Sequence, residues 1–174
     1  MQLYTNNSTG TVTYSSGEFD NSIILENDLE VLNSTGYQEA FKVNLGVNER
    51  LIFRAFLYWD YHANGDLKYR FVTPTGTVFY RHILRQSEIP ISDNITETVS
   101  QCVATNGTGE LVPGDPPSTN GQHYAWVQYG VLQAPATYAA DANKALDIQF
   151  SQNTASDTQA TVLKAGSYIE YKKF

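Results

Sequence analysis

Residues 49–61 read ERLIFRAFLYWDY, and this stretch is the strongest β-strand signal in the chain. Alternate side chains of a strand point to opposite faces, and one face here is uniformly apolar, with Leu51, Phe53, Ala55, Leu57 and Trp59. The other face is partly aromatic as well, at Phe56 and Tyr58. We therefore predict that the first face meets the core and that the second lies under another segment or subunit.

Shorter strand signals repeat on both sides of this stretch. In chain order they cover residues 22–32 with a break at 27–28, 40–45, 66–72, 77–84, 95–104, 122–132, 145–152 and 161–171. Turn residues separate them, and no segment shows clear helical periodicity. Asn64-Gly65 predicts a hairpin turn, because this dipeptide favours the tight turns that join paired strands. The sequence predicts the all-β class, as an antiparallel jelly-roll-like β-sandwich of eight or nine strands.

The chain is long enough for one domain, and its composition divides it into an arm and a body. Residues 1–23 are rich in Asn, Ser, Thr and Gly and predict an extended N-terminal arm with one short edge strand. Residues 24–174 are predicted to form the single β-sandwich domain. Residues 106–121 hold three of the six prolines and four glycines and predict a long loop. Loops of this length are commonly functional or part of an interface.

The charge balance disfavours nucleic acid as a partner. The 174 residues include 11 Lys and Arg against 18 Asp and Glu, which gives a formal net charge of -7. A basic footprint, which proteins that bind DNA or RNA carry, is absent. Charged residues make up only 17% of the chain, and a surface of this kind suits tight subunit packing because few ions need to be desolvated.

The start of the chain and its apolar segments predict the compartment. Residues 1–7 read MQLYTNN, which is polar and uncharged and unlike a secretory leader. No apolar stretch approaches the length of a membrane span, so no membrane contact is predicted. We expect synthesis in a cytoplasm and release by another route, such as inside a virion. The one cysteine, Cys102, has no partner for an internal disulfide.

No motif in the sequence predicts catalysis, a cofactor or a metal. The Asp60–Asp66 segment resembles the opening of a calcium loop, but Phe71 stands where the loop needs a bidentate glutamate. The three histidines are far apart, and no nucleophile elbow is present. Two carboxylate pairs, Asp28 with Glu30 and Asp60 with Asp66, leave a glycosidase open as a minor alternative. We prefer to interpret all four carboxylates as solvated turn residues.

Five segments, in order, resemble a family of small phage and prophage virion proteins. They are residues 24–31 (ILENDLEV), 41–49 (FKVNLGVNE), 65–71 (GDLKYRF), 147–153 (DIQFSQN) and 161–170 (TVLKAGSYIE). The resemblance implies a jelly-roll-like protein on a capsid or tail surface, and it carries over no catalytic residue. The chain departs from the pattern at residues 163–166, where one extra residue precedes the glycine.

The function predicted from these observations is structural rather than enzymatic. We expect a phage capsid decoration or cement protein that sits on the virion surface, bridges neighbouring capsid subunits and forms a homotrimer. Its partners would be the major capsid protein and copies of itself. The candidate interface residues are Tyr4, Val12, Tyr14, Phe56, Tyr58, Leu111, Val112, Pro113, Lys172 and Phe174.

The alternative is a tail-fibre or head-fibre module that binds a host-surface glycan. Aromatic side chains stack on sugars, and the candidates are Tyr58, Trp59, Tyr124, Trp126, Tyr129 and Tyr138. Aromatic residues on strands are more often part of a core or a subunit interface. The exposure of these side chains would separate the two functions.

Overall fold

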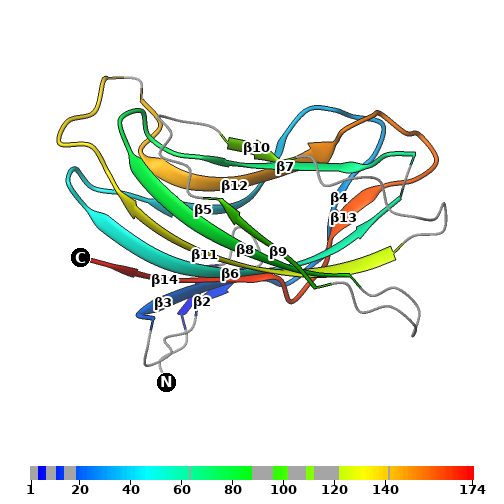
Figure 1. Cartoon of the computed structure of the whole chain (residues 1–174), viewed down its shortest axis with the longest axis horizontal. Coiled ribbons are helices and arrows are strands. Elements are labelled where there is room, and N and C mark those ends of the chain that lie inside the picture. The colour runs from blue at the N-terminus through cyan, green and yellow to red at the C-terminus, as the bar shows by residue number, and fades with distance from the viewer. Residues whose placement is uncertain are drawn as a thin grey trace.

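The computed structural model of the chain describes residues 4–6, 11–13, 19–62, 64–87, 96–101, 109–111, 122–140 and 142–174. These residues form fourteen β-strands and no helix; nine strands have five or more residues and five have three. Every described strand pair is antiparallel. The strands build two sheets that lie one above the other (Figure 1), so the predicted all-β sandwich is confirmed.

The larger sheet is built around its longest strands. It contains β1 (Tyr4–Asn6), β2 (Thr11–Thr13), β3 (Asn21–Leu25), β4 (Leu29–Val31), β6 (Arg50–Tyr61), β8 (Val78–Ser87), β9 (Thr96–Gln101), β11 (Gln122–Gln133), β13 (Thr161–Leu163) and β14 (Tyr168–Lys173). The order is β1-β2-β3-β14-β6-β11-β8-β9, and β13 pairs with both β4 and β6. Residues 49–61 thus supply β6, which pairs with β11 along its whole length and with β14 on its other side.

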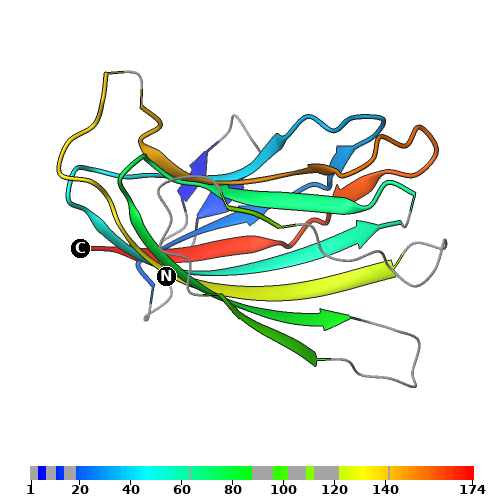
Figure 2. The same ribbon diagram turned by 45° about the horizontal axis from the view of Figure 1, so that its top comes forward.

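The smaller sheet has four strands and covers the centre of the larger one (Figure 2). It contains β5 (Gln38–Asn44), β7 (Leu67–Val72), β10 (Gly109–Leu111) and β12 (Ala145–Gln152), in the order β10-β7-β12-β5. Chain-distant strands are neighbours in both sheets, because β14 lies between β3 and β6 while β12 lies between β5 and β7. This interleaving is typical of Greek-key sandwiches.

The hairpin predicted at Asn64-Gly65 is wrong, because β6 and β7 belong to different sheets. The turn carries the chain from one sheet to the other, and the amides of Gly65 and Asp66 donate to the carbonyl of His62 at 3.2 and 2.7 Å. The positive φ falls on Asp66, at 47°, and not on the Asn-Gly pair as a tight hairpin would need. The Asp66 carboxylate accepts hydrogen bonds from the amide of Leu67 (2.7 Å) and the side chain of Asn153 (3.3 Å), which stabilises the crossover.

The predicted arm and the predicted long loop both contain short strands. In the arm, β1 pairs with β2 and β2 pairs with β3, which extends the larger sheet at its edge. Within residues 106–121, the strand β10 pairs with β7. Three residues of the expected loop are therefore part of the smaller sheet.

The core lies between the two sheets and is rich in aromatic rings. The predicted inner face of β6 is confirmed, since Leu51, Phe53, Ala55, Leu57 and Trp59 are all buried. The ring centroid of Trp59 lies 5.8 Å from that of Trp126 on β11 and 5.2 Å from that of Phe150 on β12. The two tryptophans therefore join the sheets and are not available to a ligand at the surface.

One inward position of β11 is polar. Gln128 is fully buried, and within the described part of the chain neither atom of its amide has a hydrogen-bond partner. A buried amide without partners costs about 1–3 kcal/mol in desolvation. We expect Gln128→Met, which keeps the volume, to raise the free energy of unfolding by about 1 kcal/mol in denaturant titrations. A loss of stability would mean that the amide is bonded.

An ion pair fixes the turn between β13 and β14 to the β3–β4 connection. The carboxylate of Asp28 accepts hydrogen bonds from the ammonium of Lys164 and, at 2.7 Å, from the amide of Ala165. Beside it, the carbonyl of Leu25 accepts from the amide of Gly166 at 2.8 Å, where Gly166 has a φ of 86°. This turn is thus held by both backbone and side-chain contacts.

The Asp28 pair predicts a pH dependence of stability. Hydrogen bonds from Lys164 and Ala165 lower the pKa of Asp28 from its ordinary 3.8. A carboxylate with a lowered pKa stabilises the fold above the unfolded pKa, and this contribution is lost as the pH falls through the folded pKa. We expect Asp28→Asn to cost at most about 1 kcal/mol at neutral pH, because the pair is exposed, and nothing once the carboxylate is protonated. Denaturant titrations from neutral pH to below the pKa of Asp28 measure this cost, with the exposed Asp157→Asn as the control. A difference in unfolding free energy between wild type and Asp28→Asn that stays constant with pH would contradict the role of the ion pair.

Candidate interaction surfaces

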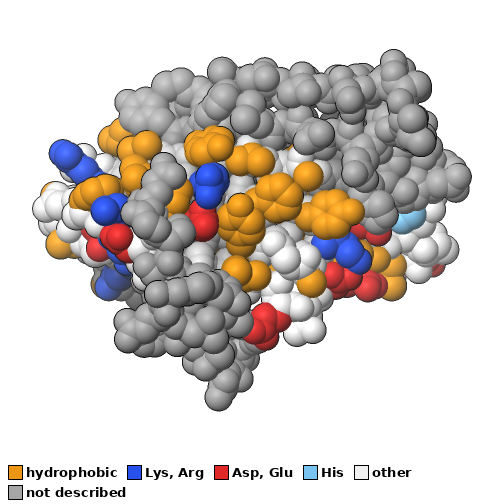
Figure 3. All heavy atoms as spheres, turned by 90° about the horizontal axis from the view of Figure 1, so that it is seen from below, with side chains coloured by type: hydrophobic (Ala, Val, Ile, Leu, Met, Phe, Trp, Pro, Cys, Tyr) orange, Lys and Arg blue, Asp and Glu red, His pale blue; other side chains and the backbone are white. Residues whose placement is uncertain are grey.

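The outer face of the larger sheet carries a row of apolar side chains at its centre. The strand register places Phe56 of β6 between Tyr168 of β14 and Val127 of β11. The rings of Phe56 and Tyr168 stack, with centroids 5.7 Å apart. Farther along β11 on the same face, Tyr129 is 41% exposed and Val131 is 51% exposed. We call Phe56, Tyr58, Val127, Tyr129, Val131 and Tyr168 the apolar strip; Figure 3 shows hydrophobic side chains across this face.

An ion pair lies next to the apolar strip. The guanidinium of Arg54 donates to the carboxylate of Glu170 from two nitrogens, at 2.5 and 3.1 Å, and this contact raises the pKa of Arg54. The same guanidinium lies 5.5 Å from the ring centre of Phe19, which is 6% exposed. Part of the second face of β6 is therefore covered by the chain itself, as predicted, while Tyr129 and Val131 stay open to solvent.

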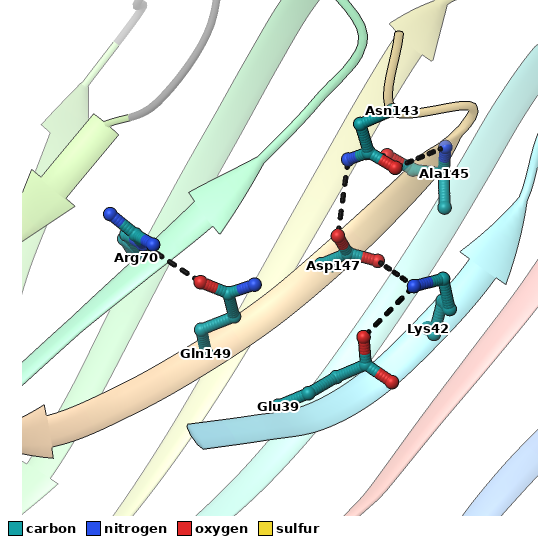
Figure 4. A network of polar contacts seen from close by, with 7 residues as sticks. All are labelled: Glu39, Lys42, Arg70, Asn143, Ala145, Asp147 and Gln149. Atoms are coloured by element: carbon teal, nitrogen blue, oxygen red, sulfur yellow. Dashed lines mark hydrogen bonds and ion pairs between the residues drawn. The ribbon is translucent and has the colours of Figure 1, made fainter. Parts of the chain in front are cut away.

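The outer face of the smaller sheet is polar. At its centre, the carboxylate of Asp147 on β12 lies 3.6 Å from the ammonium of Lys42 on β5, which also donates to Glu39 at 3.0 Å (Figure 4). The side chain of Asn143 donates to the other oxygen of Asp147 at 3.1 Å. Burial raises the pKa of Asp147 against the opposing effect of Lys42, because the side chain is almost inaccessible to water. This network joins β5 to β12 and uses its charges internally.

A second polar group lies on the same face, toward β7. The Nε of Arg70 donates to the side-chain oxygen of Gln149 at 2.8 Å (Figure 4). The guanidinium of Arg70 lies 3.7 Å from the ring centre of Tyr37, and the ammonium of Lys68 lies 4.8 Å from the same ring. Two cations from alternate positions of β7 are thus held on one aromatic ring. We call Tyr37, Lys68 and Arg70 the cation pair site.

Of the ten predicted interface residues, Phe56 and Tyr58 are brought together in the apolar strip. Phe174 is 64% exposed, and Lys172 pairs with the carboxylate of Asp20 at 3.7 Å. The positions of Tyr4, Val12 and Leu111 are on β1, β2 and β10. Tyr14, Val112 and Pro113 lie outside the described residues. The interface role of the set stays a prediction.

The sequence interpretation missed Val127, Val131, Tyr168 and the cation pair site, and it named Tyr129 as a candidate for glycan binding but not for the protein interface. The apolar strip had a signal, since every odd position of residues 125–131 is apolar, although Trp126 makes the even positions partly apolar as well. Which of the two faces of β11 is buried depends on its register with β6, which the sequence alone did not supply. The cation pair site had no local signal, because its residues come from separate segments.

Two of the four carboxylates considered for chemistry, Asp28 and Asp66, have structural contacts. Asp66 is buried and stabilises the crossover, and Asp28 pairs with Lys164. Within the residues that the structure describes, no group of three or more His, Cys, Asp or Glu side chains could hold a metal ion. The same part of the chain contains no helix long and apolar enough to cross a membrane.

Comparison of the chain with known proteins finds only weak structural similarity. No family model and no curated protein matches the chain. Among solved structures, the Gx strain of infectious bursal disease virus has a TM-score of 0.21 at 9% identity, over 98% of this chain and 36% of that one. The VP2 subviral particle of infectious bursal disease virus has a TM-score of 0.21 at 12% identity, over 99% and 40%. The chain spans less than half the length of either protein, and similarity this low does not show a shared role.

Proposed function

We propose that this protein is a non-enzymatic phage virion structural protein, a capsid decoration or cement protein that bridges neighbouring capsid subunits. The observation that carries the proposal is the apolar strip on the outer face of the larger sheet. Exposed apolar side chains gathered in one patch mark a surface that another protein covers. The five segments that resemble virion proteins support a location on a virus particle. In this proposal, residues 24–174 form the single domain that binds the particle.

The geometry of the strip suits a rigid contact. Its residues lie on β6 and on the two strands that pair with it, β11 and β14, in the middle of the larger sheet. Side chains on paired strands are held in place by the backbone, so little conformational entropy is lost when a partner covers them. The interface would bury these aromatic and aliphatic groups, with the Arg54–Glu170 pair beside them, which resembles the apolar centre and polar rim of stable interfaces.

The proposal predicts that two exposed side chains are needed for binding to particles. We expect the double variant Tyr129→Ser, Val131→Ser to fold normally and to lose about tenfold or more in affinity for capsids that lack this protein, since central apolar residues dominate interface energies. Cosedimentation with such capsids measures the loss. The matched control is Leu32→Ser, Val47→Ser, which changes two side chains that are 46% and 54% exposed elsewhere. Equal binding by the two double variants would contradict the role of the strip.

The wider role is tested by removing the gene product. Mass spectrometry should find the protein in wild-type particles. Particles assembled without it should release their genome at a lower temperature than wild-type particles. A protein that is absent from wild-type particles would sink the proposal.

Glycan binding remains the second candidate, favoured by the exposed ring of Tyr129. Trp59 and Trp126, the largest of the aromatic candidates, are buried in the core and cannot stack on a sugar. The side chain of Tyr138 is half-buried, with its hydroxyl donating to the carbonyl of Leu45 at 3.0 Å. Binding to isolated host glycans that is lost in Tyr129→Ser, without binding to capsids, would replace the first function with this one.

A further inference from the structure

The cation pair site places two cations without a carboxylate partner among the described residues side by side on one strand. Of the nine Lys and Arg side chains that the structure describes, five pair with carboxylates, namely Lys42, Arg54, Lys164, Lys172 and Lys173, while Arg50 and Lys144 do not. Lys68 and Arg70 have no such partner in the described part of the chain, although the whole chain has seven more acidic than basic side chains. Two like charges at alternate positions of one strand repel each other unless an anion lies near them.

The site is also held in place. The ring of Tyr37 lies against both cations, and Gln149 accepts from the Nε of Arg70. A guanidinium bound through Nε has its two terminal nitrogens directed away from that bond, in the fork that matches a carboxylate. Lys68, Arg70 and Tyr37 are all half-buried, so an arriving anion would be partly shielded from water.

We propose that the cation pair site binds an extended acidic segment of another protein, with one carboxylate on Lys68 and one on Arg70. The spacing supports this occupant. Alternate residues of a strand share one face, so an extended segment with acidic residues at positions i and i+2 presents two carboxylates on one side, as Lys68 and Arg70 present two cations from alternate positions of β7. The net charge of -7 opposes the long array of phosphates in a nucleic acid but tolerates two carboxylates. This inference does not depend on the virion role.

The test uses peptides that differ only in spacing. The peptide TETET, capped at both ends, has its two glutamates on one face of an extended chain, and TTEET has them on opposite faces. Titration of the full-length protein, followed by the Nε–Hε signal of Arg70 in NMR spectra, should show saturable binding of TETET about tenfold tighter than TTEET. The corresponding signal of Arg54, which is paired with Glu170, serves as the internal control and should not move.

Variants and competing anions complete the test. Arg70→Gln and Lys68→Gln should each weaken TETET binding by about tenfold, while Arg50→Gln, which changes an exposed cation on β6, should not. Equal binding of both peptides, or tighter binding of inorganic phosphate or oligo(dT), would overturn the proposal. So would self-association that is lost in Arg70→Gln, because the occupant would then be a second copy.

The position of Glu110 requires its own control. The register of β10 places Glu110 opposite Arg70. If the chain filled its own site, Glu110→Gln should tighten TETET binding by about tenfold, and that result would overturn the proposal. We expect a change of less than about twofold.

Discussion

Trp59→Ala is expected to lower the free energy of unfolding by about 3–5 kcal/mol, the largest effect of any single substitution considered. Trp59 is fully buried, and its ring lies against those of Trp126, Tyr69 and Phe150, with centroids 5.8, 6.1 and 5.2 Å away. These neighbours come from β11, β7 and β12, so the indole joins both sheets. Removing it leaves a cavity that paired strands cannot close by local movement.

Denaturant titration of the folded protein measures this loss. The control is Tyr129→Ala, which removes an exposed ring from the outer face of the same sheet and should change the free energy by less than about 0.5 kcal/mol. A small loss for Trp59→Ala, similar to that of the control, would mean that the two sheets do not pack through this cluster.

Gly130→Ala is expected to cost about 2–3 kcal/mol, because the core has no room for one methyl group at this position. A Cβ on Gly130 would lie 2.1 Å from Cε1 and 2.3 Å from Cζ of Phe53, so the ring would have to move by more than 1 Å, roughly the amount separating these distances from ordinary contact. The Phe53 ring is itself buried and stacks on Phe71 of the smaller sheet, with centroids 5.9 Å apart. The strain is therefore passed to the packing between sheets.

Two further variants separate this clash from a general effect of alanine. At Gly46 the nearest atom to an added Cβ is 3.8 Å away, so Gly46→Ala should be close to neutral. Phe53→Leu shortens the side chain that the methyl group meets, so Gly130→Ala should cost less in that background than in the wild type. If the cost is the same in both backgrounds, Phe53 does not lie over Gly130.

The alternation of side chains made much of the fold predictable. Residues 49–61 show both the inner face of β6 and its partly covered outer face, and residues 145–152 match β12 without any shift. The break at Asn27-Asp28 separates β3 from β4 as expected. These features depend on neighbours in the sequence, which is why local patterns carry them.

The connections were harder to predict, because a turn does not say which sheet receives the next strand. Asn64-Gly65 favours a hairpin locally, but burying Leu67, Tyr69 and Phe71 against β6 requires β7 to lie in the opposite sheet. Core formation outweighed the turn preference here, and Asp66 adopts the positive φ that the connection requires.

The candidate surfaces depend on contacts between distant segments. Phe56 and Tyr168 are more than a hundred residues apart and stack only because β14 pairs with β6. Tyr37 reaches Arg70 from the connection before β5. The types of side chain were visible in the sequence, while their grouping required the register of both sheets.

The central claim is that the outer face of the larger sheet binds other subunits of a virus particle. An electron cryomicroscopy reconstruction of the intact particle tests it most directly. The account predicts density for this sandwich on the capsid surface, with Tyr129 and Val131 against a neighbouring subunit. A reconstruction that places the sandwich on the capsid with these two side chains in solvent, or that contains no copy of the chain, would contradict it.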